Sequence, residues 1–320
     1  MSRGSDYVKI FIITIIIILL LYLLITLIMF LLVSRKKEKD FSPMAKAVAE
    51  TLKPYKKLID EGNKWIKEKY KKKQVKDVYI KNSEGLTLHA FFIENKKHKG
   101  IMLEDHGYRS TSKRDIYPSC FHYYNLGYSL LLIDNRTAEL SEGKYITFGV
   151  KESNDIISWV KYLNKKYSKT DIILAGVSMG ASAILMSMNR INDNMNVKGI
   201  IADSAYISGY EEVKYCINHY FHIPGILFID MINIWCKLIA KFDLKGRTTI
   251  RSMKDSKIPV LLIHGKEDDF VPPENSIITF KKYKGPKKLL LFSKASHGIS
   301  YLVNPDYYVN SVKEFLNKGE

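Results

Sequence analysis

One five-residue segment of this chain has the residue types and spacing of an activated nucleophile. Residues 176–180 read Gly-Val-Ser-Met-Gly directly after the apolar run Asp171–Ala175, and a helical pattern begins at Met179. A tight strand-to-helix turn needs glycines beside the serine, because larger side chains would collide there. The serine oxygen is then exposed at a helix amino end, where unpaired amides favour a developing oxyanion. The pattern predicts Ser178 as a nucleophile, and the alternative is an ordinary glycine-rich turn.

A serine hydroxyl needs a general base, and the base needs a group that orients it. His297 follows the last predicted strand, Lys288–Phe292, by five residues and lies in a polar turn that leads to the final helix. It is the predicted base, and the alternative is a surface-loop histidine. His106 directly follows one predicted strand and His264 ends another, and each stands before a glycine. We expect these two histidines to organise their turns.

The orienting acid is expected after the predicted strand Ile258–His264. Three consecutive acids stand there, Glu267, Asp268 and Asp269. Asp268 is the preferred candidate, because the Val-Pro pair that follows restricts the loop before the next helix. Asp269 is its near rival. Asp203, which ends the strand beside the nucleophile strand, is the remaining alternative.

These residues are placed by a regular alternation of short apolar runs and helical patterns. The predicted strands are Val78–Lys81, Leu86–Ile93, Ile101–Asp105, Tyr128–Asp134, Asp171–Ala175, Gly199–Asp203, Ile258–His264 and Lys288–Phe292. The predicted helices are Arg114–Leu126, Lys151–Lys166, Met179–Arg190, Pro273–Tyr283 and Asp306–Asn317. This order predicts an α/β fold with a mostly parallel eight-stranded sheet and helices on both faces. Ligands bind such sheets beyond the carboxyl ends of the strands, where Ser178 lies.

The order Ser178, Asp268, His297 is the nucleophile–acid–base order of the α/β-hydrolases. From about residue 78 to 317 the chain resembles a serine α/β-hydrolase of the membrane-anchored bacterial "cell-surface hydrolase" type, related to monoacylglycerol-lipase-like and prolyl-oligopeptidase-like enzymes. The matching segments are 106–108, 176–180, 264–272, 285–288 and 296–298. The resemblance implies the α/β-hydrolase fold, no metal or organic cofactor, and an oxyanion hole made by the backbone N–H groups of Tyr108 and Met179.

The chain departs from that family in the loop after the fourth strand. Relatives carry Arg-Gly-His-Gly-x-Ser there, whereas this chain keeps Arg136 and Ser141 and loses the small residues between them. Glu104 and Asp105 end a central strand, where an apolar pair is usual. We expect one of these two acids to pair with Arg136.

An insertion of about fifty residues, 205–256, separates the strands that end at Asp203 and begin at Ile258. Its apolar stretch predicts a helical cap with an apolar pocket for an acyl or alkyl chain; the alternative is that these side chains only pack the cap on the core. Cys216 and Cys236 lie in the insertion, and their irregular spacing favours free thiols over a disulfide. His219 and His222 have a metal-type spacing, but no third ligand is near them in the sequence, so no metal site is predicted.

The chain begins with an uncharged apolar run, residues 10–33, broken only by Thr14, Tyr22 and Thr26. At ~1.5 Å per residue this run is roughly 36 Å long, more than the ~30 Å hydrocarbon core of a bilayer. We expect a transmembrane helix after a short flank, residues 1–9. A cleaved signal peptide is the alternative, but the run exceeds the usual apolar region and no small-residue cleavage site follows it.

Positive charge is concentrated just after the apolar run. Residues 34–76 hold 15 Lys and Arg against 6 Asp and Glu, so their net charge is 15 − 6 = +9. This is more than half of the net charge of +17 of the whole chain. Their apolar positions recur at helical spacing. They form either a solvated helical stalk or a polybasic collar on anionic lipid. No nucleic-acid-binding motif accompanies the charge, so nucleic acid is not an expected partner.

The basic side of the apolar run also predicts orientation. Two basic residues precede the run, whereas four follow it within six residues: Arg35, Lys36, Lys37 and Lys39. The positive-inside rule then places the following domain, residues 77–320, in the cytoplasm, with the extracytoplasmic side as the alternative.

The sequence thus predicts a single-pass membrane-anchored serine hydrolase of carboxylic esters or thioesters, with an acyl-enzyme intermediate. Ser178 attacks the carbonyl, His297 moves the proton, and Asp268 orients the imidazole. The expected partners are a small ester or acyl substrate and the lipid bilayer. The alternatives are a serine peptidase of small peptides and a non-catalytic membrane scaffold that retains the fold.

Overall fold

An eight-stranded sheet forms the centre of the molecule. The structure, a computed structural model, describes residues 2–35 and 49–317, with side chains from residue 6 onward. All eight predicted strands are present, within three residues of their predicted bounds. They are β1 Val75–Lys81, β2 Thr87–Ile93, β3 Gly100–Asp105, β4 Tyr128–Ile133, β5 Ile172–Val177, β6 Val197–Asp203, β7 Val260–Gly265 and β8 Lys287–Phe292.

The strands lie in the order β1-β2-β4-β3-β5-β6-β7-β8. Strand β2 pairs antiparallel with β1 and with β4, and the other pairs are parallel. The sheet is therefore mostly parallel, as predicted. The carboxyl ends of β3, β5, β6 and β7 share one edge, and the loops that leave this edge can place side chains for chemistry.

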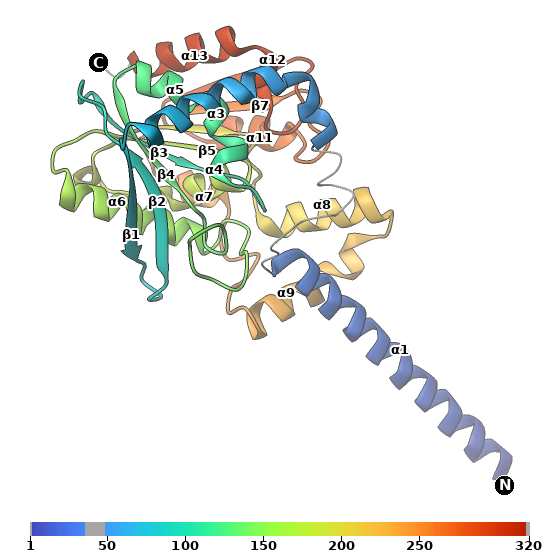
Figure 1. The fold of residues 1–320 in the computed structure, drawn as a ribbon. Helices are drawn as coiled ribbons and strands as arrows, with labels where there is room; N and C mark the ends of the chain where they lie inside the picture. The colour runs from blue at the N-terminus through green and yellow to red at the C-terminus, as the bar shows by residue number, and fades with distance from the viewer. Residues whose placement is uncertain (1, 36–48, 318–320) are drawn as a thin grey trace.

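Helices cover both faces of the sheet, because successive strand residues point to opposite faces. In β5, Leu174 joins one apolar cluster, whereas Ile173 and Ala175 join another. The first face is covered by α6 Glu152–Lys166, α7 Met179–Ser187, α10 Thr249–Met253 and α11 Glu274–Lys282. The second is covered by α3 Lys56–Lys71, α5 Tyr117–Asn125, α12 Ser300–Val303 and α13 Pro305–Asn317 (Figure 1). Shorter helical pieces are α4 Ser112–Asp115, η1 Lys53–Tyr55, η2 Met188–Arg190 and η3 Asp193–Met195.

Helix α3 is a layer of the domain, so its interpretation as part of a solvated stalk is wrong. Ile66 is buried in the same apolar cluster as α5, and the ring of Trp65 lies 5.2 Å from that of Tyr124. The two helices approach so closely that a Cβ on Gly62 would lie 2.1 Å from the Tyr117 carbonyl oxygen. The predicted boundary at residue 77 therefore falls too late. Residues 36–48 of the expected stalk lie outside the described part of the chain, and a lipid collar stays a prediction.

Replacing Gly62 with alanine distinguishes a packed helix from a solvated one. In a solvated helix the change stabilises by about 1 kcal/mol, because glycine is a poor helix former. Against α5 the added methyl group overpacks the contact, which costs about 1–3 kcal/mol. We therefore expect Gly62→Ala to lower the midpoint of thermal unfolding of the full-length protein, whereas Lys64→Ala on the exposed side of α3 leaves it nearly unchanged. A midpoint raised by Gly62→Ala would contradict the packing.

The predicted cap lies between β6 and β7. It consists of α8 Gly209–Phe221, the short turn η4 Gly225–Leu227 and α9 Ile229–Leu238. Its inner side forms an apolar cluster that contains Val213 and Ile217 of α8 and Ile232 of α9. Cys216 and Cys236 are free thiols. Within the described residues, no group of three His, Cys, Asp or Glu side chains surrounds His219 and His222 as a metal site would require.

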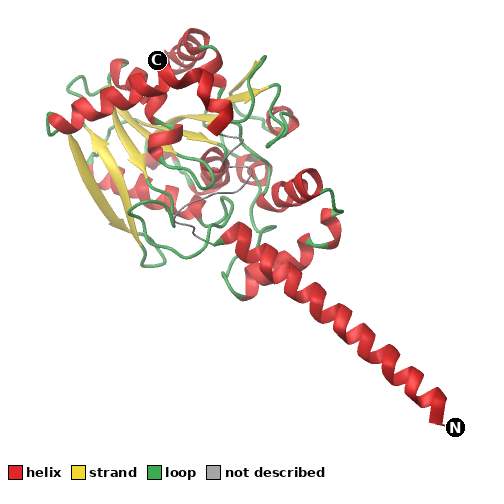
Figure 2. Ribbon diagram, turned by 45° about the vertical axis from the view of Figure 1, so that its right-hand side comes forward, coloured by secondary structure: helices red, strands yellow, loops and turns green. Residues whose placement is uncertain are grey.

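The amino-terminal run forms one helix, α1 Ser2–Ser34. Its portion Asp6–Ser34 is long and apolar enough to cross a membrane. Figure 2 shows α1 projecting from the rest of the molecule, with only its carboxyl-terminal part beside other elements. That part contacts α9 of the cap, and Phe30 is buried there.

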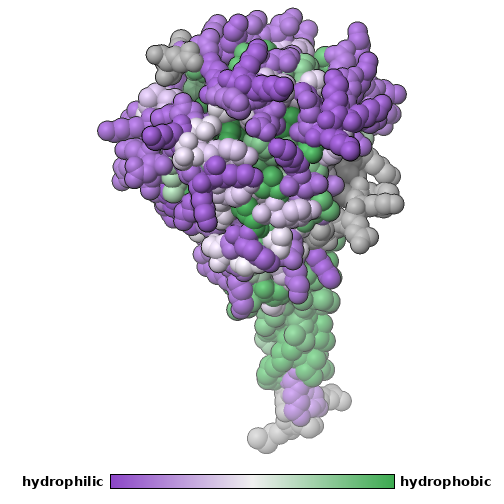
Figure 3. Space-filling view, turned by 60° about the vertical axis from the view of Figure 1, so that its left-hand side comes forward, coloured by the Kyte–Doolittle hydropathy of each residue, from purple (hydrophilic) through white to green (hydrophobic). Residues whose placement is uncertain are grey.

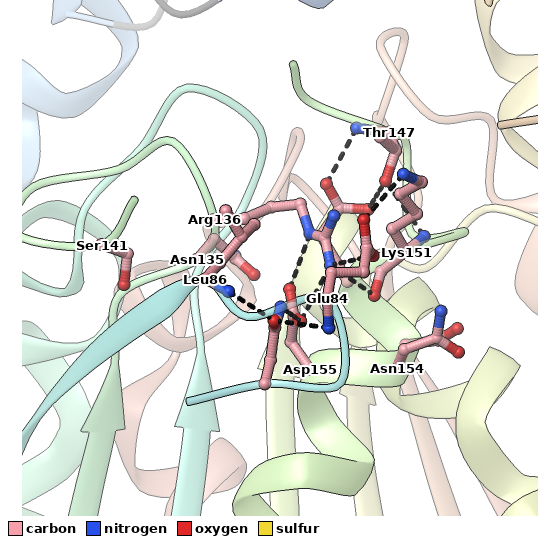
Figure 4. A network of polar contacts seen from close by, with 12 residues as sticks. Glu84, Leu86, Asn135, Arg136, Ser141, Thr147, Lys151, Asn154 and Asp155 are labelled. Atoms are coloured by element: carbon pink, nitrogen blue, oxygen red, sulfur yellow. Dashed lines mark hydrogen bonds and ion pairs between the residues drawn. The ribbon is translucent and has the colours of Figure 1, made fainter. Parts of the chain in front are cut away.

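Arg136 pairs with neither acid at the end of β3, so the predicted pairing is wrong. Its guanidinium makes two hydrogen bonds to Asp155 of α6, at 2.7 and 2.8 Å, and one to Glu84 at 3.0 Å (Figure 4). Arg136 follows β4, and its side chain reaches across to α6 instead of back to the sheet. Burial raises the pKa of Glu104 well above its ordinary value, which favours a neutral carboxyl there.

Candidate active site

Ser178 occupies a strained turn between β5 and α7. Its φ of 56° and ψ of −117° are unusual for a residue with a side chain. The flanking glycines allow the close approach of backbones that this turn requires. A Cβ on Gly176 would lie 2.7 Å from the Ala181 nitrogen, and one on Gly180 would lie 2.4 Å from the Asp105 carbonyl oxygen. The sharp turn predicted from the two glycines is therefore what the backbone forms.

The structure brings the three predicted catalytic side chains together. His297, in the loop between β8 and α12, lies with Nε2 at 2.8 Å from Ser178 Oγ. Its Nδ1 lies 2.8 Å from Asp268 Oδ2, in the loop after β7. With Nδ1 protonated, the imidazole donates to the carboxylate and its Nε2 accepts from the serine hydroxyl. This is the order of contacts that general-base activation of a serine requires.

Asp268 is held by its own loop as well as by His297. Its Oδ1 accepts hydrogen bonds from the backbone N–H groups of Phe270 and Val271, at 3.1 and 2.8 Å. Burial alone would raise its pKa, but the nearby histidines and their hydrogen bonds hold the pKa well below its usual range. The carboxylate is therefore charged throughout the neutral range.

The two rival acids make other contacts. Asp269 is exposed, and its backbone carbonyl accepts from the Tyr215 hydroxyl at 2.9 Å. Asp203 is buried, and its carboxylate accepts from the hydroxyl groups of Ser204 and Ser300 at 3.1 and 3.3 Å. The geometry thus favours Asp268 among the three candidates.

His264 is a second histidine on the same carboxylate, a contact that the sequence interpretation missed. Its Nε2 lies 3.1 Å from Asp268 Oδ2 and 2.8 Å from the Val271 carbonyl oxygen, so this nitrogen carries the proton. Its Nδ1 accepts from the Ser276 hydroxyl at 2.6 Å. His264 does organise its turn, as predicted, and also positions the acid. The signal in the sequence was its place four residues before Asp268.

Opposing influences act on the imidazole of His297. Burial lowers its pKa, but the charge and hydrogen bond of Asp268, with smaller contributions from Glu212 and Asp115, outweigh burial and raise the pKa above its ordinary 6.5. A general base must be neutral to accept a proton. The site is therefore inactive where His297 is protonated and becomes active as the pH rises through the raised pKa.

We accordingly expect kcat/KM for ester hydrolysis to fall on the acid side with a midpoint above pH 6.5. Chromatographic detection of the released acid is the suitable measurement, because its signal does not depend on the ionisation of a reporter. A midpoint at or below 6.5 in the unmodified protein would contradict this assignment of the base.

Tyr108 and Met179, the predicted oxyanion residues, both lie beside the nucleophile. Met179 is the first residue of α7. Tyr108 follows Gly107, where an added Cβ would lie 3.3 Å from the Cβ of Ser178. Their backbone amides are thus carried by the two segments that adjoin the serine, and their role in stabilising an oxyanion stays a prediction.

Apolar and aromatic side chains from several segments, including the cap, lie around the catalytic residues. The ring of Phe270 lies 4.8 Å from that of His297, and Tyr220 of α8 lies 6.1 Å from Phe270. Met179, Tyr206 and Val271 form an apolar cluster with Phe270 and Tyr108. These side chains form an apolar surround for the triad, whereas an acyl pocket beneath the cap stays a prediction.

Glu212 of α8 is the polar exception in this surround. It is buried, and its Oε1 accepts from the Cys216 thiol at 3.4 Å. Burial raises its pKa to about 8, against the attraction of His297. Near neutral pH it is mostly a neutral acid, able to donate a hydrogen bond above the triad.

Comparison with known proteins gives relatives in sequence and in structure. No protein-family model matches the chain. The chain is 27% identical over 197 residues to the uncharacterised protein YqkD of Bacillus subtilis, covering 61% of this chain and 64% of that protein. It is 29% identical over 126 residues to the uncharacterised protein YfhR of Escherichia coli K12, covering 39% of this chain and 38% of that protein. The chain thus spans less than two thirds of the length of either relative.

The solved structures that resemble the chain include two esterases. The Pyrococcus furiosus esterase PF2001 has a TM-score of 0.61 and 25% sequence identity, and the match covers 76% of this chain and 90% of that one. Est1E from Butyrivibrio proteoclasticus has a TM-score of 0.56 and 20% identity, with 76% of this chain and 98% of that one covered.

Proposed function

We propose, from the premise that this chain is an α/β-hydrolase, that it is a serine hydrolase of carboxylic esters or thioesters. The observation that carries the proposal is the position of His297, whose two ring nitrogens each lie 2.8 Å from a predicted partner, Ser178 on one side and Asp268 on the other. The esterase activity named for the Pyrococcus furiosus neighbour supports the same reaction class.

The proposed reaction proceeds in two steps. Ser178 Oγ attacks the substrate carbonyl carbon while His297 Nε2 takes the hydroxyl proton, and the negative charge on the carbonyl oxygen is stabilised by the amides of Tyr108 and Met179. His297 then gives the proton to the leaving alcohol or thiol, which leaves an acyl group on the serine. Water, deprotonated by the same imidazole, hydrolyses this acyl-enzyme and restores Ser178.

Labelling with a fluorophosphonate probe tests the nucleophile directly. The probe phosphonylates only an activated serine, so we expect the full-length protein to be labelled at Ser178 and the Ser178→Ala variant to be unlabelled. Ser158→Ala, on helix α6, is a matched control that should keep the label. Labelling that persists without Ser178 would overturn the assignment, and an unlabelled but folded wild-type protein would favour the scaffold alternative.

The leaving group is the next question for the same site. A serine peptidase would use the same three side chains, so geometry alone does not separate esters from amides. Hydrolysis rates on an ester, a thioester and an amide with one common acyl group would separate them. We expect the ester and thioester to react faster than the amide.

We further propose that α1 anchors the protein in a membrane with the catalytic domain on the cytoplasmic side. The length and composition of Asp6–Ser34 support the anchor, and the excess of basic residues after it supports the orientation. Protease added outside intact cells should leave the domain uncut. Its digestion there would overturn the orientation.

A further inference from the structure

Helix α1 is hydrogen-bonded to the cap at Tyr22 and Thr26, well before its last residue, Ser34. The hydroxyl of Tyr22 donates to the carbonyl oxygen of Leu227 at 2.7 Å, and the indole N–H of Trp235 donates to Thr26 Oγ at 3.1 Å. Figures 1 and 2 both show α1 running beside the cap over this stretch. From Ile10 to Leu21, in contrast, every side chain of the helix is exposed.

The part of α1 that is clear of the cap is too short to cross a bilayer. Ile10 to Leu21 is 12 residues. At ~1.5 Å per residue these positions extend roughly 18 Å, whereas the hydrocarbon core is ~30 Å thick and needs about 20 residues. Starting at Ile10, the span must continue to about Met29. The segment from Tyr22 to Met29, to which the cap is attached, therefore lies at hydrocarbon depth.

The cap carries the surface that such a position requires. Large apolar side chains are exposed along α8, η4 and α9, where soluble proteins rarely gather so many. Phe221 is 62% exposed and Leu227 is 60% exposed. The set that we name the cap face is Phe221, Ile226, Leu227, Ile234, Leu238 and Ile239. Figure 3 shows that the surface of α1 is apolar up to the base of the hydrophilic body, so the apolar surface of the anchor reaches the domain.

The polar groups of the contact are also suited to a medium without water. Hydrocarbon offers no hydrogen bonds, so polar groups inside it must find protein partners. Of the three polar side chains in the run, Tyr22 and Thr26 bond to the cap. The third, Thr14, donates to the carbonyl oxygen of Ile10 at 2.8 Å. Each polar side chain of the run is therefore satisfied within the protein.

We propose that the cap face is immersed in the bilayer leaflet beside α1, so that the catalytic domain sits partly in the membrane instead of above it on a stalk. The occupant of the cap face is thus lipid hydrocarbon. The inference rests on the proposed membrane anchoring by α1. Immersion of the cap face would also place Tyr220, the neighbour of Phe221, at the lipid-facing end of the cap. The ring of Tyr220 contacts that of Phe270, which in turn contacts His297.

A depth-sensitive probe at three positions tests the immersion. The fluorophore NBD is attached to a cysteine introduced by Leu227→Cys on the cap face, Ile17→Cys on the free part of α1, or Leu140→Cys. Leu140 is a matched leucine, 56% exposed and outside the cap. The full-length variants are reconstituted in phosphatidylcholine and phosphatidylglycerol vesicles, with and without lipids that carry a doxyl quencher on the acyl chain, and the parent chain is the control for its native thiols.

We expect quenching and a blue-shifted emission at 17 and at 227, with quenching several-fold greater at 227 than at 140. If position 17 is quenched while 227 behaves like 140, the anchor stands and the immersion of the cap is overturned. If position 17 is not quenched, the proposed anchoring fails and the immersion fails with it. Hydrolysis of a short soluble ester by each variant shows that its fold is intact. Because this ester does not have to enter the membrane, the result tests the catalytic proposal separately from the immersion of the cap face.

Discussion

Replacing Ser178 with alanine is expected to lower kcat for hydrolysis of a short p-nitrophenyl ester by about a million-fold, the size seen when a serine nucleophile is removed from a triad. The change removes the hydroxyl oxygen that His297 is positioned to deprotonate, Oγ at 2.8 Å from Nε2. It leaves the amides of Tyr108 and Met179 in place. A residual rate above that of uncatalysed hydrolysis is therefore expected, because the proposed oxyanion donors remain.

The same experiment with His297→Ala shows whether the residues act as a unit. We expect a loss of the same size, and no further loss when both substitutions are combined, because neither group works without the other. Steady-state kinetics with high enzyme concentration, together with thermal unfolding to confirm the fold, measures this. A double variant far slower than either single one would show that the two residues contribute independently and would contradict the proposed mechanism.

The second large effect is expected at Asp268. Asparagine there should lower kcat by about ten-thousand-fold, because the neutral amide favours the wrong imidazole tautomer and does not stabilise the imidazolium. In the structure Asp268 Oδ2 accepts from His297 Nδ1 at 2.8 Å. Its two backbone donors, Phe270 and Val271, keep the side chain in this position.

Asp269→Asn is the matched control for Asp268→Asn. The two residues are adjacent and the substitutions are chemically identical, but Asp269 is exposed and interacts through its backbone carbonyl. We expect its activity to stay near that of the unmodified protein. The reverse result, with Asp269→Asn inactive and Asp268→Asn active, would assign the triad acid to the neighbouring position.

Much of the fold was predictable because it is encoded locally. Tyr128–Ile133 and Val260–Gly265 are buried along their whole length. Strands inside a parallel sheet are covered on both faces, so they appear in the sequence as nearly continuous apolar runs. Glycines beside Ser178 signalled a sharp turn, and the helix after it supplied the rest of the pattern. Since parallel strands end at a common edge, residues that follow β5, β7 and β8 could be expected to meet there.

Contacts between distant elements were harder to predict, because an amphipathic pattern does not name its partner. The apolar stripe of α3 has the same sequence pattern on a solvated stalk as on a helix packed against α5. The contacts of Gly62 and Trp65 with α5 distinguish the two. The guanidinium of Arg136 can pair with any acid that lies close enough. The path of the loop after β4 brings Arg136 to Asp155 rather than to Glu104, and the sequence pattern does not contain that path.

The sequence by itself determined the order of the strands along the chain, the sharp turn at Ser178, the candidates for acid and base, and the apolar helix α1. These depend on residue type and on spacing over a few residues, where sterics and burial act directly. Only the tertiary structure decided that Asp268 rather than Asp269 meets His297, that His264 shares the same carboxylate, and that the cap is attached to α1 at Tyr22 and Thr26. Such choices depend on angstrom-scale distances between elements far apart in the chain, which packing sets and local pattern does not contain.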